Sequence, residues 1–426
     1  MAAVSDALAQ LIQRAGAAAN EGRWQDAERL WSQVQQVDPG HPQALYSLGI
    51  HALQRGDNAA ALELLRAAQQ AASGDPLIPL SIAMVLRESG DAAGEWEAIH
   101  QALAIDAYFL PGLLGKGALL ERVRGARSAA GVYRNALKVA PPEPHWPAVL
   151  RGQLLHARAV VERHQEEFAA FLAHRIEAPR AALQQAAQGR WDEAASIMAG
   201  HTRPYLPDCN QLYVPRLPAV PFFDPALFGW VADLESRTEA IRDELEALLR
   251  EQATGFAPYV AYKPGDPVNQ WQELNHSTRW NTYKLWKDGA PVEEHLARCP
   301  QTAAALQEVE MAQLDGLCPN AMFSVLAPHT HIPPHHGETN ARVVVHLPLI
   351  VPEGCRYRVG FEQRQWQVGK VLVFDDSIEH EARNDSDEHR VVLIFDTWNP
   401  LLSEPERSMV QAMMLASREF AAGAER

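Results

Sequence analysis

Histidines are concentrated between Ser324 and Arg390, a stretch that holds seven of the 17 histidines in the chain. His335 precedes one run of β-branched residues, and His380 follows another. Histidines at strand ends that converge across a small β-barrel commonly hold a redox metal, because neutral imidazole binds iron, copper, zinc and nickel. Arg390 stands ten residues after His380, and its planar guanidinium can bind a carboxylate through two parallel hydrogen bonds. Together these residues predict an Fe(II) oxygenase that uses 2-oxoglutarate.

Two motifs in this stretch, PHHGETNARVVVHL and GKVLVFDDSIEHE, together with the arginine that follows them, resemble the aspartyl/asparaginyl β-hydroxylase family. The resemblance covers about residues 205–402. It implies that His335 and His380 are the iron ligands, that Arg390 and Ser324 hold the carboxylates of 2-oxoglutarate, and that His346 lines the cosubstrate pocket. It also implies that O₂ is consumed, that 2-oxoglutarate is decarboxylated to succinate, and that an aspartyl, asparaginyl or related amino-acid residue is hydroxylated at its β-carbon.

Most non-haem oxygenases complete the iron ligand set with a carboxylate two residues after the first histidine. Here that position is Gly337, and the resemblance implies that water takes the place of the carboxylate. We expect the glycine to leave room for this water, which Asp376 could hold. Three acids are alternative ligands: Asp375, Asp376 and Glu338. Loop capping and orientation of His380 explain the two aspartates better.

The histidine tract offers more imidazoles than one site needs. His336 directly follows His335, so in an extended backbone it points the other way and only one of the two can bind the metal. His329 and His331 could instead join His380 in a cupin-like site of three histidines. This three-histidine metalloenzyme is the main chemical alternative.

The residue at position 344, a valine, does not identify the substrate of the enzyme. Family enzymes that act on protein aspartate tend to carry an arginine at the corresponding position, and valine cannot pair with a carboxylate. The family also includes enzymes that act on free or carrier-bound amino acids and on lipid acyl chains. A different kind of hypothesis is a repeat-based interaction protein whose barrel is inactive or only senses a ligand.

The first 142 residues repeat with a period of 34. Small residues recur at one place in each repeat: Ala15, Gly49, Ala83 and Gly117. Glycines recur at another place, Gly22, Gly56 and Gly90, with Arg124 where a fourth would fall. This pattern is the tetratricopeptide signature of two helices per repeat, and it predicts an α-solenoid. A solenoid is a scaffold, so it is as consistent with a spacer as with a site for a peptide or protein substrate.

The fold class we predict is multidomain α + β. The tetratricopeptide domain spans 1–142, a helical extension or linker spans 143–203, and prolines between Pro204 and Pro225 mark the join to the next domain. Residues 204–404 are expected to form a double-stranded β-helix, or jelly roll, and residues 405–426 a C-terminal helix. The jelly roll is predicted from short alternating runs, which lie at 321–326, 342–349, 356–358, 364–368, 371–374 and 391–395.

Alternation along the 342–349 run assigns Arg342, Val344 and His346 to one face, which we interpret as a lined pocket because polar residues stand among apolar ones. The opposite face is core. Upstream, residues 255–286 form an aromatic and polar stretch that we read as loop-like. Its Trp280, Tyr283 and Trp286 are expected in the core, whereas substrate contact stays open for Gln270, Asn275 and Arg279.

The composition of the chain argues against several classes of binding partner. A formal charge of −15 argues against nucleic acid and against anionic membranes. Four cysteines without CxxC spacing argue against a zinc–cysteine site or a disulfide framework. No run approaches the ~18 apolar residues of a membrane span, and the N-terminus lacks a basic segment followed by an apolar one. We therefore expect a cytoplasmic protein with no membrane partner.

Overall fold

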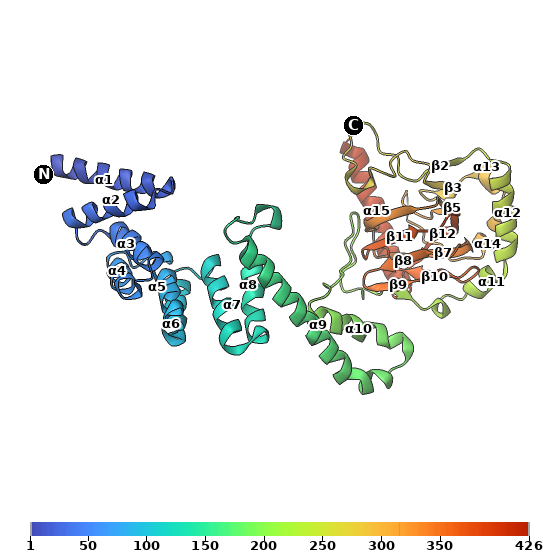
Figure 1. Ribbon diagram of the computed structural model, residues 1–426. Coiled ribbons are helices and arrows are strands. Elements are labelled where there is room, and N and C mark those ends of the chain that lie inside the picture. Colours follow the sequence, from blue (N-terminus) through green and yellow to red (C-terminus); the bar gives the residue numbers. More distant parts are fainter. Residues whose placement is uncertain (1, 315, 425–426) are drawn as a thin grey trace. The chain divides into compact units, whose positions relative to one another are not determined.

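The computed structural model describes residues 2–314 and 316–424. The chain divides into two compact units, Met1–His201 and Thr202–Arg426. The first is entirely helical, and the second is built mainly of antiparallel strands (Figure 1). The finer boundaries expected at residues 142, 203 and 404 stay predictions. No helix among the described residues has the length and apolar character needed to cross a membrane.

The helical unit begins with consecutive antiparallel helix pairs, as the 34-residue period predicts. The pairs turn at Gly22, Gly56 and Gly90, whose φ angles of 73°, 80° and 76° favour glycine. The fourth turn uses Gly125, with φ 85°, one residue after the position expected from the repeat. The helices are α1 (Ala2–Asn20), α2 (Trp24–Val37), α3 (Pro42–Gln54), α4 (Asn58–Ala71), α5 (Leu77–Glu88), α6 (Ala92–Ile105), α7 (Leu110–Arg124), α8 (Ala126–Val139), α9 (Arg151–Ala181) and α10 (Gln185–Ala199).

The small residues of the repeat lie where the two helices of a pair cross. Ala15 and Ala83 are buried. A Cβ on Gly49 would lie 2.8 Å from Leu65, and a Cβ on Gly117 would lie 2.3 Å from the ring of Tyr133. The recurring small side chain is therefore a packing requirement, and the expected tetratricopeptide solenoid is confirmed.

We predict that Gly117→Ala destabilises the helical unit by about 1–3 kcal/mol, because an added methyl group in a closed crossing forces neighbours to move. Gly131→Ala is the matched control. Gly131 also lies inside a helix, but a Cβ there meets nothing within 4 Å, so the change should stabilise by up to about 1 kcal/mol. Urea unfolding of the full chain, followed by helical circular dichroism, measures both. Equal midpoints for the two variants would show that the crossing tolerates a side chain.

The second unit contains two antiparallel sheets. The larger has the order β1-β10-β7-β12-β5-β3-β2, with β4 paired to β3, and the smaller has the order β6-β11-β8-β9. Their strands are β1 (Phe222–Phe223), β2 (Phe256–Pro258), β3 (Trp280–Lys287), β4 (Ala290–Pro291), β5 (Ala321–Leu326), β6 (Thr330–His335), β7 (Arg342–Ile350), β8 (Cys355–Val359), β9 (Glu362–Arg364), β10 (Leu372–Phe374), β11 (His380–Asn384) and β12 (Arg390–Trp398). The expected antiparallel β domain is confirmed.

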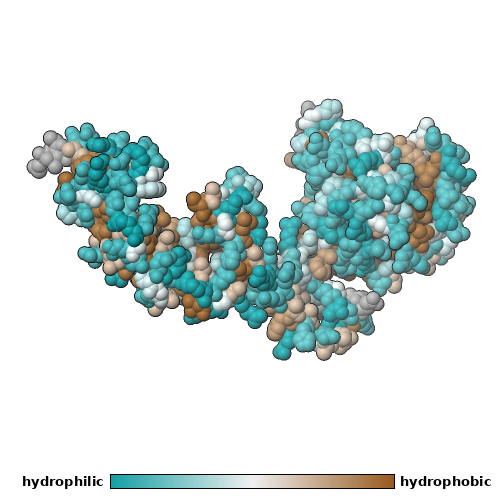
Figure 2. Space-filling model, viewed as in Figure 1, coloured by the Kyte–Doolittle hydropathy of each residue, from teal (hydrophilic) through white to brown (hydrophobic). Residues whose placement is uncertain are grey.

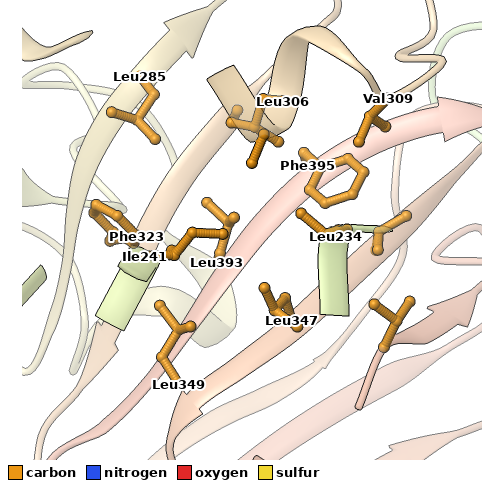
Figure 3. Packing of buried hydrophobic residues seen from close by; sticks show 14 of the residues in the cluster. Leu234, Ile241, Leu285, Leu306, Val309, Phe323, Leu347, Leu349, Leu393 and Phe395 are labelled. Carbon is orange, nitrogen blue, oxygen red and sulfur yellow. The ribbon is translucent and has the colours of Figure 1, made fainter. Parts of the chain in front are cut away.

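The two faces of the larger sheet differ in chemistry. One face packs against α11 (Val231–Ser236), α12 (Thr238–Arg250) and α14 (Pro300–Gln307) through a continuous apolar cluster. Figure 3 shows side chains of these helices, such as Ile241 and Leu306, beside Phe323 and Leu393 of the strands. The other face looks toward the smaller sheet and carries the polar residues of the candidate site. On the side drawn in Figure 2, most of the domain surface is hydrophilic.

Six strands were not predicted: the short β1, β2 and β4, and the longer β3, β6 and β11. β3 falls in the stretch read as a loop, whereas β6 and β11 carry the two histidines themselves. β6 contains Pro333 and Pro334, which cannot donate to a ladder, and it is accordingly an edge strand of the smaller sheet. The strand expected at 364–368 is β9, which lies at Glu362–Arg364 instead.

The remaining helices are η1 (Glu143–His145), η2 (Pro225–Leu227), η3 (Asn269–Trp271), α13 (Glu293–Leu296) and α15 (Glu404–Ala424). The C-terminal helix expected at 405–426 corresponds to α15, and the last two positions of that expectation lie outside the described residues.

Candidate functional site

A cavity of about 660 Å³ lies between the two sheets. All five residues singled out from the sequence line it: Ser324, His335, His346, His380 and Arg390. They come from β5, β6, β7, β11 and β12, so residues up to 66 positions apart in the chain meet in one space. The antiparallel pairing of these strands brings the five side chains together.

His335 and His380 are paired across the ladder where β6 ends and β11 begins, and their ring centroids are 4.0 Å apart. The Nδ1 of His335 donates to the carbonyl of Pro333 at 2.8 Å, and the Nδ1 of His380 donates to the carbonyl of Ile378 at 3.0 Å. Each ring therefore keeps its proton on Nδ1 and has a free lone pair on Nε2. Burial lowers the pKa of His335 to about 3 and that of His380 to about 4. Two neutral imidazoles of fixed tautomer suit a divalent metal.

Arg390 is 1% exposed, and neither its Nε nor one of its terminal nitrogens has a hydrogen-bond partner among the described residues. Its guanidinium carbon lies 4.7 Å from the ring centroid of Trp366, a cation–π contact. Burial lowers the pKa of Arg390 to about 10, so the group stays charged at neutral pH. A buried cation without an anion costs free energy. The site is therefore suited to an anion that the described residues do not supply.

Two tryptophans orient the neighbouring polar groups. Trp280 Nε1 donates to Ser324 Oγ at 3.0 Å, and Trp366 Nε1 donates to His346 Nδ1 at 3.2 Å. Burial, followed by the nearby charge of Arg390, lowers the pKa of His346 well below its usual value. With Nδ1 accepting, the proton of neutral His346 is on Nε2. Ser324 and His346 thus each offer one remaining donor.

The role of Trp366 was missed at the level of sequence, where it is a single tryptophan in a polar run. Trp280 and Tyr283 are buried as expected, but in different apolar clusters on opposite faces of the sheet. The reason is that residues three apart in a strand point to opposite sides. Trp286 is only partly buried. Trp280 therefore contributes to the site as well as to packing.

Arg342 is also buried, but it is surrounded by acids. Its guanidinium donates to Asp376 at 2.9 Å and to Glu338 at 2.5 Å, and it lies 3.5 Å from Asp396. These carboxylates raise the pKa of Arg342 well above its usual value, although burial alone would lower it. We call Glu338, Asp376 and Asp396 the acidic wall; all three line the cavity.

Asp375 does not reach the cavity. Its carboxylate accepts hydrogen bonds from the N–H of Ser377 at 3.0 Å and from the Ser377 hydroxyl at 2.5 Å, as in a capped turn. Burial raises the pKa of Asp375 to about 7. Loop capping therefore accounts for Asp375 better than metal binding.

The place that a side chain at residue 337 would take is occupied by the carboxylate of Asp376. A Cβ on Gly337 would lie 2.1 Å from Oδ2 of Asp376, and the Gly337 N–H donates to the Asp376 carbonyl at 2.7 Å. Glycine is needed here because the backbone and the carboxylate approach so closely. The glycine thus lets the Asp376 carboxylate approach the position after the histidine pair, and the expectation that a water completes the metal site stays a prediction.

The three-histidine alternative does not form among the described residues. His329 lies 2.9 Å from Asp387, and His331 lies 2.7 Å from Glu381, both through their Nε2 atoms. In the described part of the chain, no group of three or more His, Cys, Asp or Glu side chains is arranged to hold a metal ion. His336 lines the cavity, contrary to the expectation that it points away. β6 ends at His335, so strict alternation does not extend to the next residue.

The upstream segment contributes aromatic residues to the cavity, including Tyr259, Tyr262 and Trp271. Asn275 and Arg279, for which substrate contact was left open, do not line it. Asn275 instead accepts from the N–H of Tyr262 at 2.9 Å, and Arg279 donates to the carbonyl of His329 at 2.6 Å. Both shape the segment beside the cavity, and Gln270 does not line the cavity either.

Both units of the chain match known protein families. Residues 235–400 match the family model described as aspartyl/asparaginyl beta-hydroxylase, and residues 12–76 match a tetratricopeptide repeat. The β domain is an aspartyl/asparaginyl β-hydroxylase family domain. The sequence resemblance is thereby confirmed, and the family indicates a hydroxylase.

Curated relatives of the hydroxylase-family domain carry different substrate names. The ornithine lipid ester-linked acyl 2-hydroxylase of Rhizobium tropici is 39% identical over 46% of this chain and 66% of its own length. The aspartyl/asparaginyl beta-hydroxylase of Mus musculus is 34% identical over 50% of this chain and 28% of its own length. The human aspartate beta-hydroxylase domain-containing protein 2 is 31% identical over 51% of this chain and 58% of its own length. The chain thus spans less than two thirds of each of these relatives.

Solved structures similar to this chain include a crystal structure of the MamA protein, which is 13% identical. The similarity covers 42% of this chain and 98% of that chain, with a TM-score of 0.31.

The lowered pKa values of the two histidines lead us to expect that any metal they bind is held equally well in mild acid. We predict that the Mn(II) affinity of the full chain changes less than about threefold between pH 7.5 and pH 5.5, because both imidazoles stay neutral above pKa values of about 3 and about 4. Two histidines with the ordinary pKa of about 6.5 would be largely protonated at pH 5.5, and affinity would fall on the order of 100-fold. Titration calorimetry or electron paramagnetic resonance distinguishes these outcomes.

Proposed function

We propose that the β domain is an Fe(II)- and 2-oxoglutarate-dependent hydroxylase. The observation that carries the proposal is the unpaired Arg390 in the same cavity as the neutral pair His335 and His380. A dicarboxylate with a chelating keto acid at one end can satisfy both features at once. Iron and 2-oxoglutarate, when bound, would supply the oxidising power for inserting one oxygen atom of O₂ into a C–H bond.

Each residue of the site then has a role that its contacts support. The free Nε2 lone pairs of His335 and His380 would hold the iron. Arg390 would bind the distal carboxylate of 2-oxoglutarate, with Trp366 under its guanidinium to fix the plane of the fork. Ser324 and His346 would donate hydrogen bonds to the cosubstrate, because each has one donor that no other described residue accepts.

Apolar side chains around these groups restrict water. Val392 and Phe374 belong to the buried cluster between the sheets, and Tyr357 packs 5.2 Å from His346, centroid to centroid. Excluding water strengthens each charged contact in the cavity and protects reactive species from side reactions. The protein would thus position the reactants and exclude water from the cavity, and no side chain needs to act as a general base.

The names of the relatives support two substrate classes, aspartyl or asparaginyl residues and the acyl chain of a lipid. The tetratricopeptide repeats favour a peptide or protein, which they would engage outside the cavity. For an amino-acid residue the expected site of hydroxylation is the β-carbon.

The proposal is tested by the two histidines. His335→Ala and His380→Ala should each reduce 2-oxoglutarate-dependent succinate formation by at least about 100-fold, because a site with only two protein ligands cannot absorb the loss of one. His331→Ala is the control, since that histidine is engaged with Glu381. Succinate is measured by mass spectrometry on the full chain. Substantial turnover in both alanine variants would overturn the assignment.

Variants of Arg390 test whether 2-oxoglutarate is the cosubstrate that binds there. Arg390→Ala should weaken 2-oxoglutarate binding by about 2–5 kcal/mol, the range for removing one partner of a buried charge pair. Arg390→Lys keeps the charge but loses the planar fork, so its KM for 2-oxoglutarate should rise by a smaller amount. Arg364→Ala is the matched control, because Arg364 pairs with Glu362 and does not line the cavity. An unchanged KM in Arg390→Ala would show that another cation binds the cosubstrate.

A further inference from the structure

The charges of the cavity are unevenly divided between its two ends. Arg390 stands alone at the start of β12. Asp396 lies six residues further along the same strand, about 20 Å away at the usual rise of a strand. There it joins Glu338 and Asp376 in the acidic wall around Arg342. Three carboxylates against one guanidinium leave a net charge of −2 at this end when all are ionised.

The charge of Arg342 is already more than balanced by three acids. One terminal nitrogen donates to Asp376 and faces Asp396, while the other donates to Glu338. Its Nε is buried without a partner among the described residues. A substrate carboxylate at this guanidinium would therefore lie close to three acids that the protein already places there, and they would repel it.

One acceptor of the acidic wall is unused. Asp376 is 6% exposed, its Oδ2 accepts from Arg342, and its Oδ1 has no partner among the described residues. Asp376 also lies beside Gly337, two residues after His335, and so close to the histidine pair. A buried carboxylate oxygen without a donor costs free energy, which a ligand N–H would recover.

Other charged residues of the cavity do not reverse this balance. Lys284 and Lys263 line it from the β3 edge and the upstream segment, and Asp288 and Asp266 line it from the same two segments. The two lysines and two aspartates cancel in number. Val344, which follows Arg342 on the same face of β7, adds no charge.

We infer that the substrate presents a nitrogen hydrogen-bond donor, an ammonium or a carboxamide, to the acidic wall, and that a carboxylate is rejected there. This inference rests on the proposed function, because it assigns the wall to the substrate and the Arg390 end to the cosubstrate. A like-charged carboxylate would face Asp376 and Glu338, whereas an N–H donor would satisfy the free oxygen of Asp376.

The test is equilibrium binding of three matched probes to the metal-free full chain, followed by NMR: the N-acetyl amides of ornithine, asparagine and aspartate. Blocking both termini leaves only the side chains to differ. We expect the ornithine and asparagine probes to bind at least tenfold more tightly than the aspartate probe. Tighter binding of ornithine than of asparagine would identify the ammonium, and the reverse order the carboxamide.

Variants distinguish the effect of the acidic wall on probe binding from the effect of the overall negative charge of the protein. Glu338→Gln should weaken the ornithine probe by about two- to fivefold, the effect of one partly exposed charge, and Val344→Arg should favour the aspartate probe. Glu353→Gln, an exposed position outside the cavity, is the charge-matched control and should change nothing.

Equal or tighter binding of the aspartate probe, no binding of any probe, or an equal response to Glu338→Gln and Glu353→Gln would overturn the inference. Because no turnover is measured, a failure of succinate formation would count against the proposed function and not against this binding preference.

Discussion

The buried guanidinium of Arg390 imposes the strongest energetic demand on the β domain. Withdrawing a full charge from water costs several kcal/mol even after the protein relaxes, and the described residues offer this cation no carboxylate. Its contact with Trp366 recovers only part of that cost, and the lowered pKa of Arg390 reflects the part that remains. The same tryptophan holds His346, and Ser324 completes a ring of donors. These groups stabilise the folded domain fully only when an anion is present, so ligand binding and local stability are linked.

The larger sheet positions this guanidinium because one of its faces packs against helices and the other lines the cavity. Alternate residues of β7, β12 and β5 enter the apolar cluster against the helices, and the residues between them enter the cavity. A shift of one residue in any of these strands would exchange the two sets. The packing of Leu347 and Leu393 therefore also fixes the positions of His346 and Arg390, because each pair is joined through one backbone.

Sequence reasoning reached the repeats and the residues of the site because both leave local traces. A 34-residue period is visible without coordinates, and so are histidines next to β-branched runs. The strands β6 and β11 were missed because their prolines and polar residues suit an edge or a cavity wall rather than a buried strand. The role of Trp366 depends on two partners from distant strands, which no spacing reveals. The environment of Arg342 was equally hidden, since its three acids follow from tertiary packing.

The close contact between Gly337 and Asp376 also limits how the protein can change. A single substitution can add a ligand to a metal site. Here, however, any side chain at residue 337 would collide with the carboxylate of Asp376 as it now lies. A third protein ligand at that position requires the Asp376 carboxylate to move or to be replaced, and either change would disturb its contact with Arg342. Both changes are costly, so the proposed two-histidine arrangement should resist conversion to the commoner three-ligand one by a single mutation. The same contact gives a design rule: altered coordination requires both positions to be changed together.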